Sequence, residues 1–153
     1  MTSPPAGDRA ISGMAMVLPV DEQPKAAQRS GTGTLVCVVD DDESVRDSLY
    51  TLLDSLGFAV TTYASGREML ADERHHQVSC LIVDQHMPEM DGLATLGALR
   101  GEGSGVPTIL VTGRLDAEIA ARAKALDVGA VLAKPFAVAR LLELIRGPGE
   151  PPR

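Results

Sequence analysis

Short apolar segments alternate with segments of helical periodicity along most of this sequence. We expect strands at residues 35–39, 58–63, 78–83, 107–112 and 128–133, and helices at about 45–56, 65–73, 91–99, 116–126 and 136–146. Connections of this length between successive strands favour parallel pairing and right-handed crossovers. The pattern therefore predicts an α/β fold, a parallel five-stranded sheet with helices on both faces.

The two ends of the chain differ in composition from this alternating region. Residues 1–33 are rich in Pro, Gly, Ser, Thr and Ala without periodicity, and Pro and Gly dominate residues 147–153. Such composition is typical of linkers and tails. We expect a flexible N-terminal extension at 1–33, one folded domain at 34–147 and a C-terminal tail at 148–153.

The charge and cysteine content exclude several classes of protein. The net charge is −7, and no cluster of Lys and Arg is present to attract phosphates, so we expect no nucleic-acid binding. Cys37 and Cys80 each lie in an apolar segment, which favours buried, unpaired thiols in a reducing compartment. No apolar stretch reaches 18 residues, so we expect no membrane span and a cytoplasmic protein.

Charged and hydroxyl side chains follow the expected strands where each strand ends. Asp40, Asp41 and Asp42 follow the first strand, and Asp84 ends the third. Thr112 ends the fourth strand, and Lys134 follows the fifth. Because parallel strands end at one edge of a sheet, these side chains are expected to meet, and clustered carboxylates need a cation. Mg²⁺ with a phosphoryl group fits such a set, and an aspartate can act as its nucleophile.

Four segments carry a resemblance to a known family. VVDDDESVRDSL, LIVDQHMPEMDGL, TILVTG and LAKPF resemble, in order, the signature segments of the response-regulator receiver domain of two-component signalling. Thr112 lies 28 residues after Asp84 and Lys134 lies 50 after it, which matches the family spacing. The resemblance covers about residues 34–147 and implies a doubly wound, flavodoxin-like (CheY-like) sheet of strand order 2-1-3-4-5.

The resemblance also implies roles for individual residues. Asp84 resembles the phosphoacceptor, Thr112 the switch hydroxyl and Lys134 the lysine that pairs with a phosphoryl oxygen. The implied Mg²⁺ ligands are Asp41 directly, Asp40 largely through water, Asp84, and the backbone carbonyl of His86. In the family the bond before a proline such as Pro135 is often cis.

Three aspartates in a row leave two registers for the acidic pair, 40/41 or 41/42. We choose Asp40 and Asp41 because the family places its pair directly after the strand, which leaves Asp42 to cap the next helix or stand in solvent. His75 and His76 are expected to be solvated loop residues rather than metal ligands, because no third ligand follows at a suitable spacing.

The sequence departs from the family pattern at Val131, where Phe or Tyr is usual, and at Asp127, where glycine is common. We hypothesise that phosphorylation is transmitted through the loop 113–116 instead of through an aromatic side chain. His86 and Arg114 lie two residues after Asp84 and Thr112, where their side chains can tune the lifetime of the phosphate.

The function implied is that of a stand-alone receiver without enzyme activity beyond its own phosphorylation and dephosphorylation. It would accept a phosphoryl group from a histidine kinase or a histidine phosphotransfer protein and act through protein contacts, as a monomer or a phosphorylation-dependent dimer. Two alternatives stay open: a receiver-like scaffold that is not phosphorylated, and a fragment of a longer regulator. A phosphatase of the haloacid-dehalogenase type is disfavoured, because His86 stands where a second acid is needed.

Overall fold

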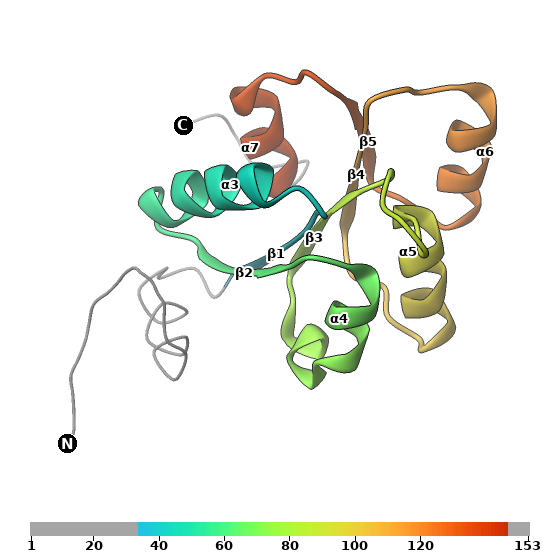
Figure 1. The fold of residues 1–153 in the computed structure, drawn as a ribbon, viewed down its shortest axis with the longest axis horizontal. Helices are drawn as coiled ribbons and strands as arrows, with labels where there is room; N and C mark the ends of the chain where they lie inside the picture. Colours follow the sequence, from blue (N-terminus) through green and yellow to red (C-terminus); the bar gives the residue numbers. More distant parts are fainter. Residues whose placement is uncertain (1–33, 147–153) are drawn as a thin grey trace.

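The computed structural model describes residues 34–146, which fold into one sheet flanked by helices (Figure 1). The strands are β1 (Leu35–Val39), β2 (Ala59–Tyr63), β3 (Cys80–Asp84), β4 (Thr108–Thr112) and β5 (Ala130–Ala133). The helices are α3 (Glu43–Ser55), α4 (Gly66–Ala71), the 3₁₀ helix η1 (Glu73–Gln77), α5 (Gly92–Gly101), α6 (Ala117–Ala125) and α7 (Val138–Arg146). The expected N-terminal extension and C-terminal tail lie outside the described residues.

All strand pairs are parallel, and the order across the sheet is β2-β1-β3-β4-β5, as the resemblance implied. Val36 of β1 pairs with Val60 of β2 on one side and with Cys80 of β3 on the other. The inner strands β1, β3 and β4 thus have a paired neighbour on each side, and their near-continuous apolar sequences suit strands that helices cover on both faces. The order reverses between β1 and β3, where sheets of this type bind ligands.

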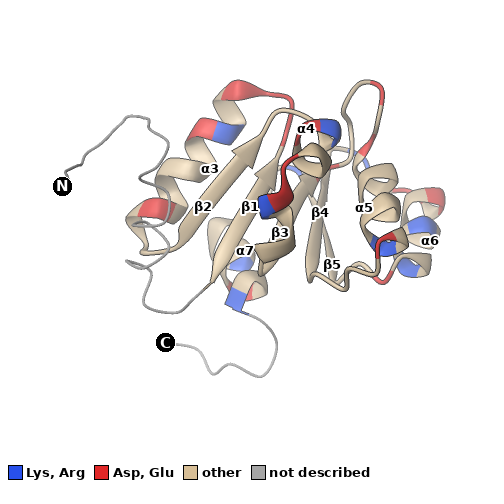
Figure 2. Ribbon diagram, turned by 90° about the horizontal axis from the view of Figure 1, so that it is seen from below, with Lys and Arg blue, Asp and Glu red and all other residues tan. Residues whose placement is uncertain are grey.

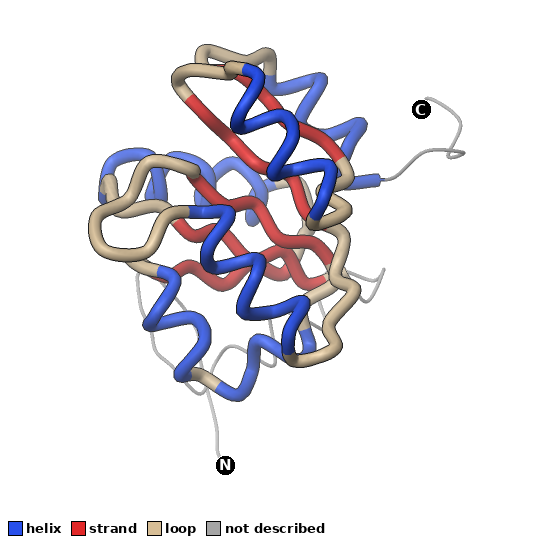
Figure 3. The backbone as a smooth tube through the Cα atoms, turned by 90° about the vertical axis from the view of Figure 1, so that its right-hand side faces the viewer, coloured by secondary structure: helices blue, strands red, loops and turns tan. Residues whose placement is uncertain are grey.

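The sheet divides the apolar core into two layers (Figures 1 and 3). Val36 and Val38 face the layer of α3 and α7, and Cys37 and Val39 face the layer of α4, α5 and α6. This alternation is the period of two that side chains follow along a strand. The helices contribute buried residues such as Leu53 to the first layer, and Leu93, Leu96 and Leu99 to the second.

One predicted helix is interrupted. The sequence predicts a helix from Ser65 to about residue 73, but α4 ends at Ala71. Asp72 adopts an extended conformation there, accepts a hydrogen bond from the Tyr63 hydroxyl, and caps η1 through the N–H of Arg74. The prediction that both histidines are solvated is wrong for His75, because η1 turns this side chain inward and leaves it 5% exposed.

Arg100 joins two loops at the amino ends of β4 and β5. Its guanidinium donates hydrogen bonds to four backbone carbonyls, those of Ser104, Val106, Leu126 and Asp127. Asp127 has a φ of 59°, a left-handed conformation that explains why glycine is common at this place. One side chain thus stabilises the chain between α5 and β4 and between α6 and β5.

The two cysteines agree with the sequence prediction. Cys37 and Cys80 are buried and unpaired, and burial raises the pKa of the Cys80 thiol to about 11. Between residues 34 and 146, no helix has the length and hydropathy needed to span a bilayer.

Candidate functional site

Three aspartates meet at the carboxyl ends of the central strands, and we call Asp40, Asp41 and Asp84 the acidic pocket. Asp40 follows β1 and Asp84 ends β3, and these strands are parallel neighbours. One carboxylate oxygen from each residue lies within 4.8 Å of the others. Figure 2 shows the acidic segment between β1 and α3 in red at this edge of the sheet.

The structure places the three consecutive aspartates in different roles. Asp40 is buried, and its Oδ1 accepts a hydrogen bond of 2.9 Å from the N–H of Asp42. The Asp42 carboxylate points away and caps α3, accepting from the N–H groups of Ser44 and Val45. The side chains grouped with Asp84 are thus those of Asp40 and Asp41, while Asp42 stabilises the helix.

The ammonium group of Lys134 lies beside the acidic pocket. Its Nζ lies 3.3 Å from Oδ1 of Asp84 and 3.9 Å from Oδ2 of Asp40. Burial raises the pKa of Asp84 and of Asp40, and the Lys134 ammonium lowers both values without cancelling that effect. Lys134 therefore compensates the clustered carboxylates only in part.

The acidic pocket fits a hard divalent cation. Oδ1 of Asp84 is buried, and apart from the ion pair with Lys134 at 3.3 Å it has no partner of hydrogen-bond geometry among the described residues. Such an orphaned acceptor costs free energy unless another positive group approaches it. Three carboxylates provide the oxygen ligands that Mg²⁺ prefers, so Asp40, Asp41 and Asp84 are the side chains that would hold it.

Thr112 is fully buried at the end of β4, and its hydroxyl is already engaged. Oγ1 donates to the carbonyl of Arg114 at 2.9 Å and accepts from the N–H of Arg114 at 3.1 Å. Nε2 of His86 lies 3.0 Å from the same oxygen, and it acts as the donor because the hydroxyl hydrogen is already used. The sequence alone did not predict this contact between His86 and Thr112.

Gln85 is a site residue that sequence analysis missed. It is buried, its Nε2 donates to Oδ2 of Asp91, and its Oε1 accepts from the N–H of Leu93. Asp91 also caps α5 through the N–H of Ala94. Gln85 therefore fixes the loop that leaves Asp84, and its place directly after an apolar strand was the only signal in the sequence.

Gly92 packs against the backbone at the end of β3. A Cβ atom added at this position would lie 2.6 Å from the carbonyl oxygen of Asp84 and 3.0 Å from a methyl group of Leu110. Only a residue without a side chain allows α5 to start this close to Asp84.

The remaining predicted positions lie around this edge. The Lys134–Pro135 bond is cis, and the Lys134 N–H donates to the carbonyl of Thr112. Val131 is half-buried and packs into the layer of α4, α5 and α6. The His86 side chain contacts Thr112, while the Arg114 side chain is exposed.

Comparison with known proteins decides the family. The model of the response regulator receiver domain matches residues 36–146, the whole of the described fold apart from its first two residues. The chain belongs to the response regulator receiver domain family. Its α/β sheet of order 2-1-3-4-5 is the CheY-like fold of that family, and receiver domains are signalling domains of two-component response regulators.

Several curated relatives of this chain are transcriptional regulatory proteins of bacteria. It is 36% identical to the transcriptional regulatory protein FixJ of Bradyrhizobium diazoefficiens over 110 residues, which cover 72% of this chain and 54% of the relative. It is 40% identical to the C4-dicarboxylate transport transcriptional regulatory protein DctR of Rhodobacter capsulatus over 103 residues, or 66% and 52% of the two chains. The chain spans about half the length of these curated relatives.

Solved receiver structures share the fold. The chemotaxis protein CheY4 of Vibrio cholerae superposes with a TM-score of 0.69 at 30% identity, covering 74% of this chain and 96% of that one. The FixJ-N structure gives a TM-score of 0.67 at 33% identity, with 74% and 90% coverage.

Proposed function

We propose that this receiver domain accepts a phosphoryl group on Asp84 from a histidine kinase or a histidine phosphotransfer protein. The observation that carries the proposal is the acidic pocket itself. A buried, unsatisfied Asp84 oxygen faces Lys134 at 3.3 Å, beside two further carboxylates and at the same edge of the sheet as Thr112.

We propose Mg²⁺ as the cofactor, held by Asp40, Asp41 and Asp84 with the backbone carbonyl of His86 as a further ligand. Its chemistry when bound is to neutralise the carboxylates and the charge of the transferring phosphoryl group. The protein's own part is to keep Asp84 ionised and aligned. Lys134 favours the carboxylate form, and Gln85 fixes the loop that follows it.

In the transfer step, a carboxylate oxygen of Asp84 forms a bond to phosphorus as the bond from phosphorus to the donor's histidine nitrogen breaks. The electron pair of that bond returns to the imidazole, and the phosphoryl group moves to Asp84 as an acyl phosphate. Lys134 is placed to pair with one of its oxygens, since its ammonium already lies beside Oδ1 of Asp84.

The hydroxyl of Thr112 has to change partners to reach the new phosphoryl group. It now donates to the carbonyl of Arg114, and that bond has to break before the same proton can serve a phosphoryl oxygen. This exchange would shift the loop 113–116, and Val131 in β5 offers no aromatic ring to follow it. We therefore propose that the loop itself carries the signal to partner proteins.

The wider setting is also part of the proposal. We propose a cytoplasmic protein that acts through protein contacts as a monomer or phosphorylation-dependent dimer, without binding nucleic acid itself. We propose a receiver that acts alone. The alternative is a receiver within a longer regulator, because the curated relatives are about twice as long. The mass of the native protein isolated from its own cells distinguishes these arrangements.

Incubation with a small-molecule phosphodonor, with and without Mg²⁺, tests the chemistry through the intact mass. We expect the wild type to gain one phosphoryl group only when Mg²⁺ is present. Asp84→Asn should gain none, whereas Asp47→Asn, which alters an exposed aspartate on α3, should behave as the wild type. A wild type that binds Mg²⁺ but gains no mass would instead support the scaffold interpretation.

A further inference from the structure

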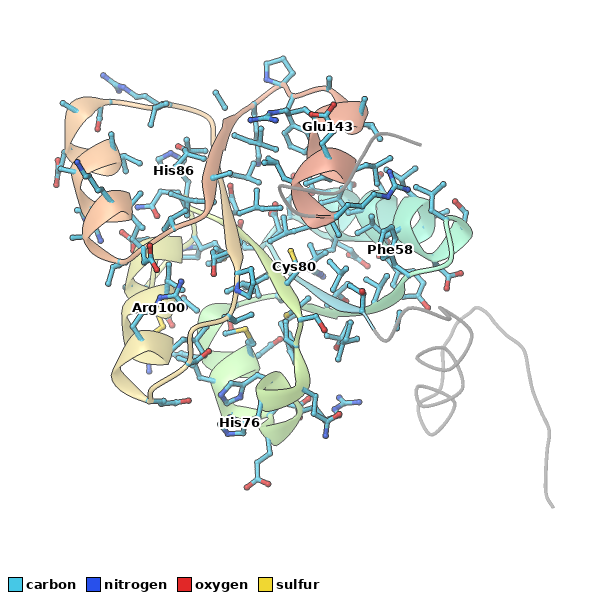
Figure 4. All side chains as sticks on the ribbon, turned by 180° about the vertical axis from the view of Figure 1, so that it is seen from behind. Phe58, His76, Cys80, His86, Arg100 and Glu143 are labelled. Atoms are coloured by element: carbon cyan, nitrogen blue, oxygen red, sulfur yellow. The ribbon has the colours of Figure 1, made fainter. Side chains whose placement is uncertain are left out.

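Two histidines and a glutamate meet at the end of the molecule opposite the acidic pocket. His75 and His76 belong to η1, which leads into the amino end of β3, and Glu102 is the C-cap residue of α5. Figure 4 shows His76 at the end of the molecule far from His86. None of these three residues has a part in the proposed phosphoryl transfer.

His75 is oriented as a metal-binding histidine is. Its Nδ1 lies 2.7 Å from the backbone carbonyl of Asp72, and because a carbonyl only accepts, Nδ1 carries the hydrogen. The ring is buried, and Nε2 faces Oε1 of Glu102 at 3.0 Å. Because a carboxylate only accepts, Nε2 donates to it and has to release that hydrogen to solvent when it binds a metal. Histidine ligands of metals typically donate their second ring N–H to a carbonyl or carboxylate in this way, which fixes the ring and its tautomer.

His76 supplies a third donor atom. Its ring centroid lies 4.1 Å from that of His75, with an angle of 35° between the planes. One ligand atom from each of His75, His76 and Glu102 lies within 4.8 Å of the other two. Glu102 and His76 are exposed at the surface, so small side-chain rotations can bring these atoms to the distances of a metal site.

The donor set differs from that of the acidic pocket. Two imidazole nitrogens and one carboxylate oxygen suit Zn²⁺, which often takes three protein ligands and leaves a fourth position open. A hollow of about 360 Å³ adjoins His76 and Glu102 and is lined also by Gly103, Ser104 and Gly105. It leaves room for a water molecule in the fourth position.

We propose that Nε2 of His75, a ring nitrogen of His76 and a carboxylate oxygen of Glu102 form a Zn²⁺ site that joins η1 to the end of α5. The rival explanation is a plain hydrogen-bonded pair of His75 and Glu102. The hydrogen-bonded pair does not involve His76, whereas a three-ligand Zn²⁺ site requires it. Replacing His76 therefore distinguishes the two explanations.

The test is calorimetric titration of the full chain, stripped with a chelator, with zinc chloride in excess Mg²⁺, which occupies the acidic pocket. We expect one equivalent of Zn²⁺ to bind. His76→Gln and Glu102→Gln should each weaken binding at least about tenfold, because loss of even an outer partner of a metal ligand costs about 10–100-fold. Both residues are exposed, so these variants should keep the fold, which thermal unfolding in chelator verifies.

Two matched variants serve as controls. His86→Gln alters the third histidine of the chain, and Glu73→Gln alters a carboxylate on the same 3₁₀ helix. Both should bind Zn²⁺ as the wild type does. Co²⁺ in place of Zn²⁺ should give the visible absorption of a tetrahedral site in the wild type and in these controls.

The proposal is overturned if His76→Gln binds Zn²⁺ like the wild type, because His75 and Glu102 would then be a structural pair. It is equally overturned if all four variants weaken binding alike, or if the wild type binds no Zn²⁺. None of these results bears on the phosphorylation of Asp84, which is measured by mass.

Discussion

Replacing Gly92 with alanine is expected to destabilise the domain, although alanine is the better helix former. The added Cβ would lie 2.6 Å from the carbonyl oxygen of Asp84, closer than carbon and oxygen approach without repulsion. That oxygen belongs to the backbone of the central strand β3, so it cannot move aside as a flexible side chain would. Overpacking of this kind costs about 1–3 kcal/mol.

Gly97 provides the matched control within the same helix. An added Cβ there would meet no atom of the described residues within 4 Å. Gly97→Ala should therefore raise the free energy of unfolding by about 0.5–1 kcal/mol, through the helix preference of alanine alone. Gly92 is the first residue of α5, where the helix preference of alanine counts for less than in the interior, so we expect a net loss of about 1–3 kcal/mol for Gly92→Ala.

Urea unfolding followed by far-UV circular dichroism measures both variants. The two free energies of unfolding should move in opposite directions from the wild type, with unchanged dependence on urea concentration. If Gly92→Ala is as stable as Gly97→Ala, the close packing of α5 on Asp84 is not what requires glycine. A displaced Asp84 carbonyl should also slow the gain of a phosphoryl group by Gly92→Ala but not by Gly97→Ala.

Three further predictions concern stability and reactivity. Burial and the hydrogen bond to Asp72 raise the pKa of Tyr63 to about 12 from an ordinary value of 10.0. The folded state holds this proton more tightly, so its contribution is complete below pH 10 and is lost between pH 10 and 12. Tyr63→Phe should abolish that loss in denaturation at varied pH, and an unchanged pH dependence would contradict it. Arg100→Met should lower the free energy of unfolding by about 2–3 kcal/mol, because four loop carbonyls lose their donor, and a loss below that range in urea titration would argue against this role. Cys37 and Cys80 should react with a thiol reagent only as fast as the domain opens, and rapid labelling of the native protein would contradict their burial.

The sequence predicted the sheet well because the strands are largely apolar and several helices begin after a recognisable capping residue. Ser65, Asp91 and Asp116 all cap helices as N-caps do. The strand ends followed from the same pattern, which is why Asp40, Asp84 and the side chains beside them could be expected at one edge. Their chemical roles came from the family resemblance, and phosphorylation itself stays a prediction.

Contacts between residues far apart in the chain were beyond the sequence. Glu102 lies 27 residues after His75, and nothing in local spacing indicates that the end of α5 reaches η1. The contact of His86 with Thr112 likewise depends on how β3 and β4 pair. The interruption at Asp72 was missed because a helical pattern does not reveal a side chain that caps a new turn and binds Tyr63.

Strand β3 and helix α5 both run between the two ends of the molecule. β3 starts beyond the histidines of η1 and ends at Asp84, and α5 starts beside Asp84 and is followed by its C-cap residue, Glu102. A ten-residue helix is about 15 Å long, and a rigid element of that length moves as one body. Any coupling between the proposed Zn²⁺ site and Mg²⁺ in the acidic pocket must then be reciprocal, because each ion changes the affinity for the other by the same factor. With such coupling, a change in zinc concentration would alter the affinity of the acidic pocket for magnesium.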